Sequence, residues 1–361
     1  MSVDILMEVP YISYADGYGQ SAPELIEIVH SICNDNGLTL NLLQARVLDK
    51  KHTLPEKINK FRSLMVSVHQ APKAKIMFRY HHPRTEKYTA EKLVSYTMFE
   101  TDRIPSLWVD VLNQSDAVIV PTPWQQTLFQ SALSVPVSVV HVPLAQVFLN
   151  KYSDECIVGS VPDSPFIAAT VGTKSTYDRK RMLDLVAAFS GEFINEEAIL
   201  RCKCRFMRPV NLPNIEVMPG SYDTDWMLKF YLASHIGLYM SGGEGFGMPQ
   251  MEAALLGRPV VVAKNTAMIW GSTIMPWVCA LDCIDSPARY NEKYLGLVGN
   301  WGFCDSVEFI EQARLLFDEW VADPDAYKHK MIKAHNSNEL RDTLSHDNIK
   351  RQLESILLPL L

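Results

Sequence analysis

Two glutamates around a glycine-rich turn are the residues of this chain best suited to chemistry. Glu244 lies in the turn GGEGFG (242–247), and Glu252 follows eight positions later in the string PQMEAALL. Pro249 suits the first position of a helix, and Gly257 suits the position just after its end. The spacing therefore predicts one carboxylate in a loop and a second one turn inside a short helix.

The turn and its two carboxylates together suit a ligand that carries several hydroxyl groups and, nearby, an anionic group. A carboxylate can accept hydrogen bonds from vicinal hydroxyls of a sugar ring. Glycines in the turn let backbone amides approach an anion, and the N-terminus of the following helix favours negative charge. A generic turn with solvated glutamates is the plainer interpretation of such residues.

The elements that position these side chains follow an alternating pattern of short apolar runs and amphipathic helices, as in parallel α/β proteins. Strands are predicted at 3–9, 38–43, 75–80, 116–122, 137–142, 166–172, 197–203, 214–218, 236–240 and 259–263. Helices are predicted at 21–37, 103–113, 123–133, 179–189, 306–322, 325–337 and 346–358.

The strands fall into two sets on either side of the irregular stretch 143–165. We therefore expect two Rossmann-like domains that face each other across a cleft, the first at 1–155 and the second at 156–340. The last segment, 341–361, is expected to pack back on the first domain. In such sheets ligands bind at the carboxyl ends of the strands.

Composition fits a globular protein with two domains. The chain has 361 residues, of which 47% are hydrophobic and 21% charged. No apolar run is long enough to cross a membrane, and the N-terminal segment has neither the basic start nor the cleavage site of a secretory signal. The seven cysteines show no CxxC spacing. They are interpreted as reduced, buried thiols in a cytoplasmic protein.

Charge is distributed unevenly along the chain. The segment 46–92 contains twelve basic and four acidic residues, whereas the whole chain has a net charge of −7. A solvated basic face is the plainer interpretation of such a segment. Attraction to an anionic partner, such as membrane lipid, an acidic glycan or DNA, is the sharper one, so peripheral binding to a membrane stays open. The sequence does not indicate an oligomeric state.

The string EGFGMPQMEAALLGRPVV (244–261) closely resembles the element EGFG-x-P-x-x-E-A-x-x-x-G-x-P-V-V of retaining glycosyltransferases of family 4, which have the GT-B fold. The matching residues are Glu244, Gly245, Phe246, Gly247, Pro249, Glu252, Ala253, Gly257, Pro259 and Val260. The resemblance implies that Glu244 contacts the donor sugar and that Glu252 holds the nucleotide ribose. It also makes Gly245, Phe246 and Gly247 donor-binding residues.

The resemblance extends upstream to TVGTKSTYDRKRMLDLVAAF (170–189), which is similar to the segment where an arginine and a lysine bind the donor diphosphate. Lys180 matches the lysine, and Gly172 is implied on the donor side. Thr173 stands where the arginine is usual. Lys174 is the expected substitute, although a lysine lacks the bidentate fork of arginine.

The N-terminal half is similar more loosely. DGYGQSAPEL resembles the glycine-bearing first loop of the family, in which Gly17 and Gly19 would approach the donor phosphate. Ser21 and Glu24 form a capping box that predicts a helix start at Ser21, where an anion is favoured. The string FETD resembles an acceptor-side segment and places Glu100 there as a catalytic residue.

No metal and no resident cofactor are expected. Asp223-Thr224-Asp225 has the D-x-D form of a metal site, but it stands directly before a predicted helix. There Asp223 is better explained as the N-cap. The nucleotide sugar, linked to UDP or GDP, would be a co-substrate.

The resemblance implies a retaining hexosyltransferase that moves a hexose-type sugar from a nucleotide diphosphate to an acceptor hydroxyl. Its expected catalytic residues are Glu244, Lys180, Lys174 and Glu100. A glycan or lipid-linked acceptor is favoured, with hydroxymethylated bases of DNA as the second choice. A nucleotide-sugar epimerase and a non-catalytic module that binds nucleotide sugars stay open as alternatives.

Overall fold

The chain forms two compact units, each built on its own parallel sheet. The computed structural model describes residues 2–9, 17–44, 59–85, 89–173, 179–205, 207–290 and 295–361. The first unit comprises 1–99, 103–146 and 344–361, and the second comprises 100–102 and 147–343. Among the described residues no helix is both long and apolar enough to cross a bilayer.

The sheet of the first unit has seven parallel strands in the order β3-β2-β1-β4-β5-β6-β7. They are β1 (Ser2–Val9), β2 (Leu40–Gln44), β3 (Met65–Val66), β4 (Lys73–Tyr80), β5 (Ala90–Tyr96), β6 (Ala117–Val120) and β7 (Val137–Val139). The direction in which strands are added reverses between β1 and β4, which makes this the topological switch point of the sheet.

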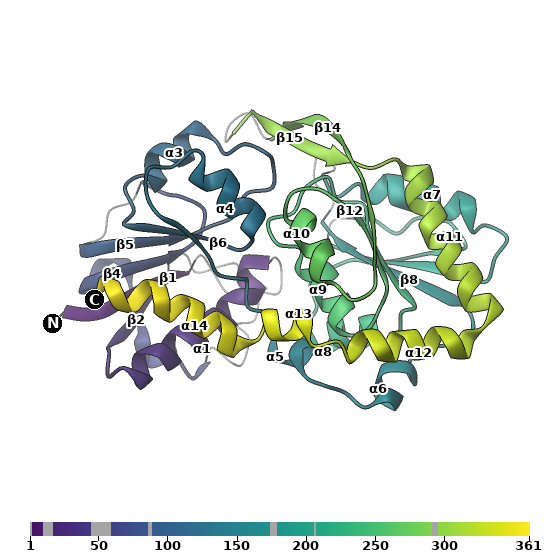
Figure 1. The fold of residues 1–361 in the computed structure, drawn as a ribbon, viewed down its shortest axis with the longest axis horizontal. Helices are drawn as coiled ribbons and strands as arrows, with labels where there is room; N and C mark the ends of the chain where they lie inside the picture. Colours follow the sequence, from purple (N-terminus) through teal and green to yellow (C-terminus); the bar gives the residue numbers. More distant parts are fainter. Residues whose placement is uncertain are drawn as a thin grey trace. The chain divides into compact units, whose positions relative to one another are not determined.

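Helices cover both faces of this sheet. They are α1 (Gly17–Asp35), α3 (Ser106–Leu112), α4 (Pro123–Gln130) and α14 (His346–Leu357), with short 3₁₀ turns at Arg62–Leu64, Val68–Gln70 and Leu358–Leu360. Figure 1 shows α1 and α14 on one face and α3 and α4 on the other. The α14 residues Ile349, Leu353 and Leu357 are fully buried in the core that α1 and the sheet share.

The second unit has a six-stranded parallel sheet in the order β10-β9-β8-β11-β12-β13. Its strands are β8 (Phe166–Gly172), β9 (Ala198–Cys204), β10 (Ile215–Met218), β11 (Ile236–Tyr239), β12 (Val260–Ala263) and β13 (Val278–Leu281). β11 and β12 are buried along their whole length, as expected for strands covered on both faces. The switch point of this sheet lies between β8 and β11.

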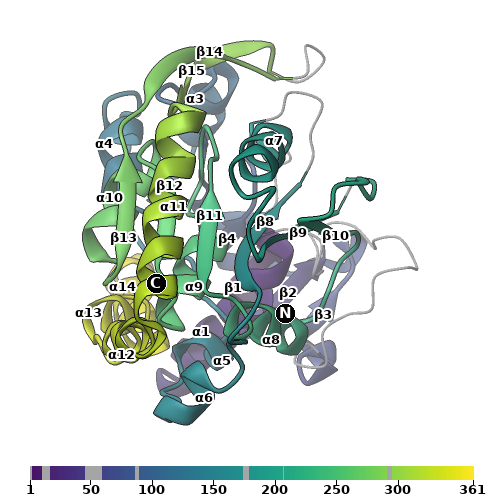
Figure 2. The same cartoon turned by 90° about the vertical axis from the view of Figure 1, so that its right-hand side faces the viewer.

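An antiparallel ribbon, β14 (Ile284–Arg289) with β15 (Leu297–Phe303), lies apart from this sheet (Figure 2). The helices of the second unit and of its junction are α5 (Gln146–Leu149), α6 (Asp154–Val158), α7 (Met182–Glu192), α8 (Thr224–Leu232), α9 (Met248–Leu255), α10 (Ala267–Ile274), α11 (Ser306–Ala322), α12 (Pro324–His335) and α13 (Glu339–Thr343).

The two-sheet α/β architecture is confirmed, with differences in detail. The chain enters the second unit at Val147 and returns to the first at Leu344, whereas the expected boundaries were 155 and 340. Asp223 caps α8 as predicted, because its side chain accepts a hydrogen bond from Trp226 N at 2.8 Å. β5, β13, α10 and the β14–β15 ribbon were not predicted.

The predicted start of the first helix is wrong. α1 begins at Gly17, so Ser21 lies one turn inside it. The Ser21 hydroxyl donates back to Gly17 O at 2.7 Å instead of capping the helix, and it also contacts Tyr80 Oη at 2.6 Å. Gly17 and Gly19 therefore belong to the first turn of α1 rather than to a loop.

Candidate functional site

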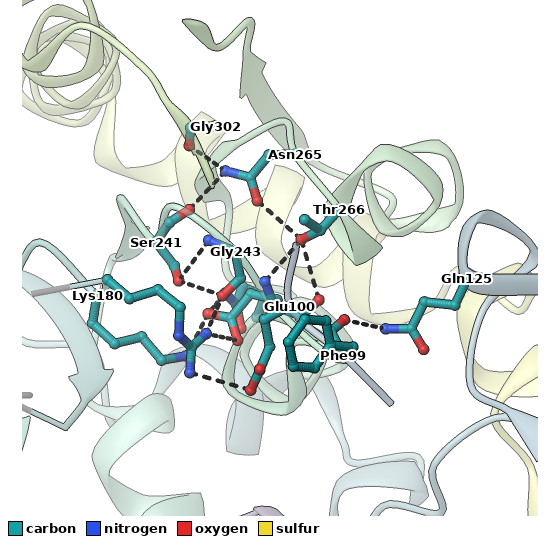
Figure 3. A network of polar contacts seen from close by, with 12 residues as sticks. Phe99, Glu100, Gln125, Lys180, Ser241, Gly243, Asn265, Thr266 and Gly302 are labelled. Atoms are coloured by element: carbon teal, nitrogen blue, oxygen red, sulfur yellow. Dashed lines mark hydrogen bonds and ion pairs between the residues drawn. The ribbon is translucent and has the colours of Figure 1, made fainter. Parts of the chain in front are cut away.

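The candidate site lies at the carboxyl ends of β8 and β11, the switch point of the second unit. Arg179 and Lys180 follow β8, and the turn that holds Glu244 follows β11. Because neighbouring parallel strands end at the same edge of a sheet, the two loops meet there. Figure 3 shows the resulting polar network.

Glu244 is the centre of this network. Its Oε1 lies 2.5 Å from Lys180 Nζ and accepts a hydrogen bond from Gln250 Nε2 at 3.2 Å. Its Oε2 lies 3.9 Å from Arg179 Nη1. The Glu244 side chain is 8% exposed, whereas those of Lys180 and Arg179 are 19% and 21% exposed. A nearly buried carboxylate thus faces two cations that solvent reaches.

Glu100 supplies a second carboxylate to the same cations. Its Oε1 lies 3.4 Å from Arg179 Nη2, and its Oε2 accepts a hydrogen bond from Tyr290 Oη at 3.5 Å. Glu100 clusters with the second unit, and its acceptor-side role stays a prediction. It lies beside the residues predicted to bind the donor.

Backbone contacts fix the turn around Glu244. Gly242 N donates to Arg179 O at 2.7 Å, and Arg179 Nη1 donates to Gly243 O. A Cβ at Gly243 would lie 2.1 Å from Glu100 O, so only glycine fits that position. On the other side, Thr266 Oγ1 accepts from Glu244 N at 2.8 Å. The turn is therefore held on both sides before any ligand binds.

Opposite charges compensate one another in this cluster. Burial alone would raise the pKa of Glu244, but the charges of Lys180 and Arg179 outweigh it and lower that pKa. Burial lowers the pKa of Lys180, and the nearby Glu244 carboxylate opposes this shift. We conclude that Glu244 is ionised and that the cations are held in place by carboxylates.

Glu252 lies on α9 and is 5% exposed. Its Oε2 accepts a hydrogen bond from Tyr231 Oη at 2.9 Å, and among the described residues its Oε1 makes none. Burial raises the pKa of Glu252 to about 7, although Tyr231 and Lys203 oppose the shift. This carboxyl therefore changes its charge near neutral pH.

The remaining predicted residues divide between the two units. Gly172 ends β8, and a Cβ there would lie 3.7 Å from Lys180 Cβ. Gly245 and Phe246 are buried in the turn, and Gly247, with φ +87°, is the residue directly before α9. Gly17 and Gly19 belong to the first unit. Lys174 lies outside the described residues.

Arg179 lies in the candidate site but was not among the residues predicted from the sequence. The resemblance implies an arginine directly after Gly172, where Thr173 stands, whereas Arg179 occurs six positions after Thr173, next to Lys180. The basic string DRKR contained a signal for it, because two adjacent cations after a strand that ends in glycine favour an anion site.

Solved structures similar to this chain include glycosyltransferases and a sugar-phosphate synthase. A glycosyltransferase from Rickettsia africae matches with a TM-score of 0.69 and 12% identity over 99% of this chain and 98% of that chain. Sucrose-phosphate synthase from Thermosynechococcus elongatus matches with a TM-score of 0.64 and 12% identity over 99% of both chains. HepE from Anabaena, solved in complex with UDP and glucose, matches with a TM-score of 0.59 and 12% identity over 99% of both chains.

The chain has the GT-B fold. At 12% identity these similarities establish the fold, while membership of family 4 stays a prediction. Neither the models of known protein families nor the curated proteins give a match to this chain. Among the described residues no group of three or more His, Cys, Asp or Glu side chains could hold a metal ion.

Proposed function

We propose that this protein is a retaining glycosyltransferase that moves a sugar from a nucleotide diphosphate to an acceptor hydroxyl. The observation that carries the proposal is the ion pair of Lys180 with Glu244, at 2.5 Å, at the switch point of a Rossmann-like sheet. Ligands of such sheets bind at this point. A diphosphate needs the cations there, and a sugar ring needs the carboxylate.

In this proposal the diphosphate of the donor replaces the carboxylates as the partner of Lys180 and Arg179. In the free protein Lys180 is paired with Glu244, and Arg179 is paired with Glu100. The diphosphate brings its own negative charges and becomes the partner of both cations. Glu244 is thereby released to accept hydrogen bonds from the sugar hydroxyls. Arg179 would supply the bidentate phosphate contact, whereas the role expected of Lys174 stays a prediction because that residue lies outside the described residues.

Glu252 is proposed to hold the ribose. Its Oε2 is already bonded to Tyr231, so its Oε1 is the oxygen that would accept from a ribose hydroxyl. This role requires the ionised carboxyl, because a protonated one has lost acceptor capacity. Binding of the nucleoside is therefore coupled to the ionisation of Glu252.

Retention is proposed to proceed on one face of the sugar. Hydrolases that retain configuration use a carboxylate nucleophile with a second carboxyl group about 5–5.5 Å away. Glu244 and Glu252 are not proposed as that pair, because the first would hold the sugar and the second the ribose. The leaving phosphate would take the acceptor's proton, and Lys180 and Arg179 would stabilise the charge that grows on it, an effect of about 3 kcal/mol per contact.

The similar structures indicate which donor to test first. HepE was solved with UDP and glucose, so a UDP-hexose is the first choice and a GDP-hexose the second. For the acceptor we propose a glycan or a lipid-linked glycan. Hydroxymethylated DNA is the alternative, and the excess of basic residues in 46–92 suits either anionic partner.

The test is mass spectrometry of reactions with a panel of UDP- and GDP-sugars, offered to glycan, lipid-linked and hydroxymethylated DNA acceptors. We expect one acceptor to gain one hexose and nuclear magnetic resonance to show the donor's anomeric configuration in the product. Conversion of the donor sugar without an acceptor would identify an epimerase. Donor binding without any turnover would identify a binding module, and inverted configuration would overturn the retaining mechanism.

A further inference from the structure

Two cysteine thiols meet at the base of the β14–β15 ribbon. Ile284 pairs with Phe303 across the ribbon, so Cys283 and Cys304 occupy the next opposing position. The two thiols are hydrogen-bonded to each other. The backbones are also close here, because a Cβ at Gly302 would lie 3.0 Å from Cys283 Cβ. Opposing positions on antiparallel strands allow a disulfide.

The two thiols differ in exposure and in acidity. Cys283 is partly exposed, whereas Cys304 is 3% exposed. The hydrogen bond with Cys304, assisted by Asn265 Nδ2 at 3.8 Å from Cys283 Sγ, lowers the pKa of Cys283. The same pairing and burial raise the pKa of Cys304. An accessible thiol that ionises readily next to a buried one is the arrangement of an attacking and a resolving cysteine.

We propose that Cys283 and Cys304 form a reversible intramolecular disulfide, in which Cys283 reacts first with a small disulfide such as oxidised glutathione. The Cys283 thiolate attacks one sulfur of oxidised glutathione, and one glutathione thiolate leaves. The Cys304 thiol then loses its proton and attacks Cys283 Sγ, and the second glutathione leaves. Two protein thiols are oxidised, and one glutathione disulfide is reduced to two thiols.

This disulfide is coupled to the candidate site through Asn265. Asn265 Nδ2 contacts Cys283 Sγ and also donates to Ser241 O at 2.8 Å and to Gly302 O at 2.7 Å. Bond formation draws Cys283 Sγ toward Cys304 and away from this amide. The turn that holds Glu244 begins at Ser241, so oxidation should lower the rate of transfer by about two- to thirtyfold, the range typical of such coupling. This coupling rests on the proposed function.

The experiment titrates the full-length protein with mixtures of reduced and oxidised glutathione and reads the products by intact mass and non-reducing peptide mapping. We expect a mass lower by two hydrogen atoms, a peptide cross-link between Cys283 and Cys304, and full reversal by dithiothreitol. Before oxidation, Cys283 should be alkylated at least about tenfold faster than Cys279, whose pKa burial raises. These readouts do not depend on any transferase activity.

Single substitutions show which of the two cysteines reacts first with glutathione. Cys304→Ser should retain one glutathione on Cys283, whereas Cys283→Ser should retain none on Cys304. Cys279→Ser is the matched control, because this nearby thiol is also partly exposed, and it should form the disulfide as the wild type does. The proposal is overturned if the wild type keeps both thiols under conditions that glutathionylate Cys279, or if Cys304 reacts first. An oxidised protein with an unchanged transfer rate would overturn the coupling to the turn.

Discussion

Glu244 connects the two halves of the candidate site, because the cations that contact it follow β8 while it follows β11 itself. Replacing it with glutamine keeps the shape and removes the charge. We expect Glu244→Gln to lower kcat at least about a hundredfold, since a charged contact that forms only with the bound sugar is lost. The partly exposed cations lose their counter-charge, so the free energy of unfolding should fall by only about 1–2 kcal/mol.

Glu216→Gln is the matched control for this substitution. Glu216 also pairs with an arginine, Arg201, at 2.8 Å, but it is 43% exposed and lies on β10 away from the switch point. Its loss should change the free energy of unfolding by less than about 1 kcal/mol and leave turnover as it is. Steady-state kinetics and urea denaturation of both variants measure the contrast. Near-normal kcat in Glu244→Gln would remove this residue from the mechanism.

A substitution of Arg179 tests whether this arginine binds the donor phosphate. Arg179→Lys keeps the charge and loses the planar fork, so donor KM should rise about tenfold while folding survives. Arg201→Lys is the control on β9, where the arginine side chain forms an ion pair with a partly exposed glutamate, Glu216. Initial-rate measurements with varied donor give both constants. If Arg179→Lys leaves donor KM unchanged, the phosphate contact must come from another residue.

The raised pKa of Glu252 predicts that the stability of the fold falls as pH rises toward 7. Its pKa is about 7 in the folded chain and 4.5 ordinarily, so between these values the folded state binds a proton that the unfolded state does not. Its contribution to stability is complete below the lower value and is lost as pH rises toward the upper one, at about 1.4 kcal/mol per pH unit.

Glu252→Gln should remove this slope, measured as the difference between the urea denaturation series of the two proteins. Affinity for the nucleotide should change in the opposite direction, because the ionised carboxyl is the better acceptor for ribose hydroxyls. Calorimetric titration with UDP should therefore show tighter binding as pH rises through about 7 in the wild type only. Parallel pH profiles for wild type and variant would show that Glu252 does not titrate there.

At the scale of elements, the sequence predicted those helices and strands that a continuous apolar run or a capping residue marks. β8, β11, β12 and α9 were found because they are apolar or lie between proline and glycine. β5 was missed because its first half reads Ala-Glu-Lys, which is largely polar and not buried. The β14–β15 ribbon was missed because a parallel α/β pattern gives no reason to expect an antiparallel pair.

Gly257 shows what a single position after a helix requires. It has φ +75°, and a Cβ there would lie 2.2 Å from Met331 O on α12. Gly257→Ala should therefore lower the free energy of unfolding by about 3 kcal/mol, from backbone strain and from displacement of α12. Gly296 has a similar φ of +63° with open space around it. Gly296→Ala should cost about 1 kcal/mol, and equal losses in urea denaturation would show that the contact with α12 carries no penalty.

At the scale of the whole molecule, the sequence could indicate two sheets but not every distant segment that completes each unit. The site illustrates this limit: Glu100 clusters with the second unit although the residues on both sides of its segment belong to the first. No local pattern marks such a segment, because its position is set by contacts with Arg179 and Tyr290 far along the chain. The last segment differs in this respect, because 341–361 was expected to pack back on the first domain, and 344–361 clusters with the first unit.

α14 belongs to the first unit although it lies at the end of the chain. We therefore predict that a substitution in α14 destabilises the first unit and leaves the second unchanged. Leu353 is fully buried in the core that α1 and α14 share. Leu353→Ala should lower the stability of the first unit by about 2–5 kcal/mol through a cavity, and Arg351→Ala, an exposed change on the same helix, by less than about 0.5 kcal/mol. Hydrogen exchange read by mass spectrometry should show faster exchange in β1 and β4 with β8 and β11 unchanged, because α14 supplies no residue to the second unit. Equal acceleration in both sheets would mean that the chain unfolds as one cooperative body.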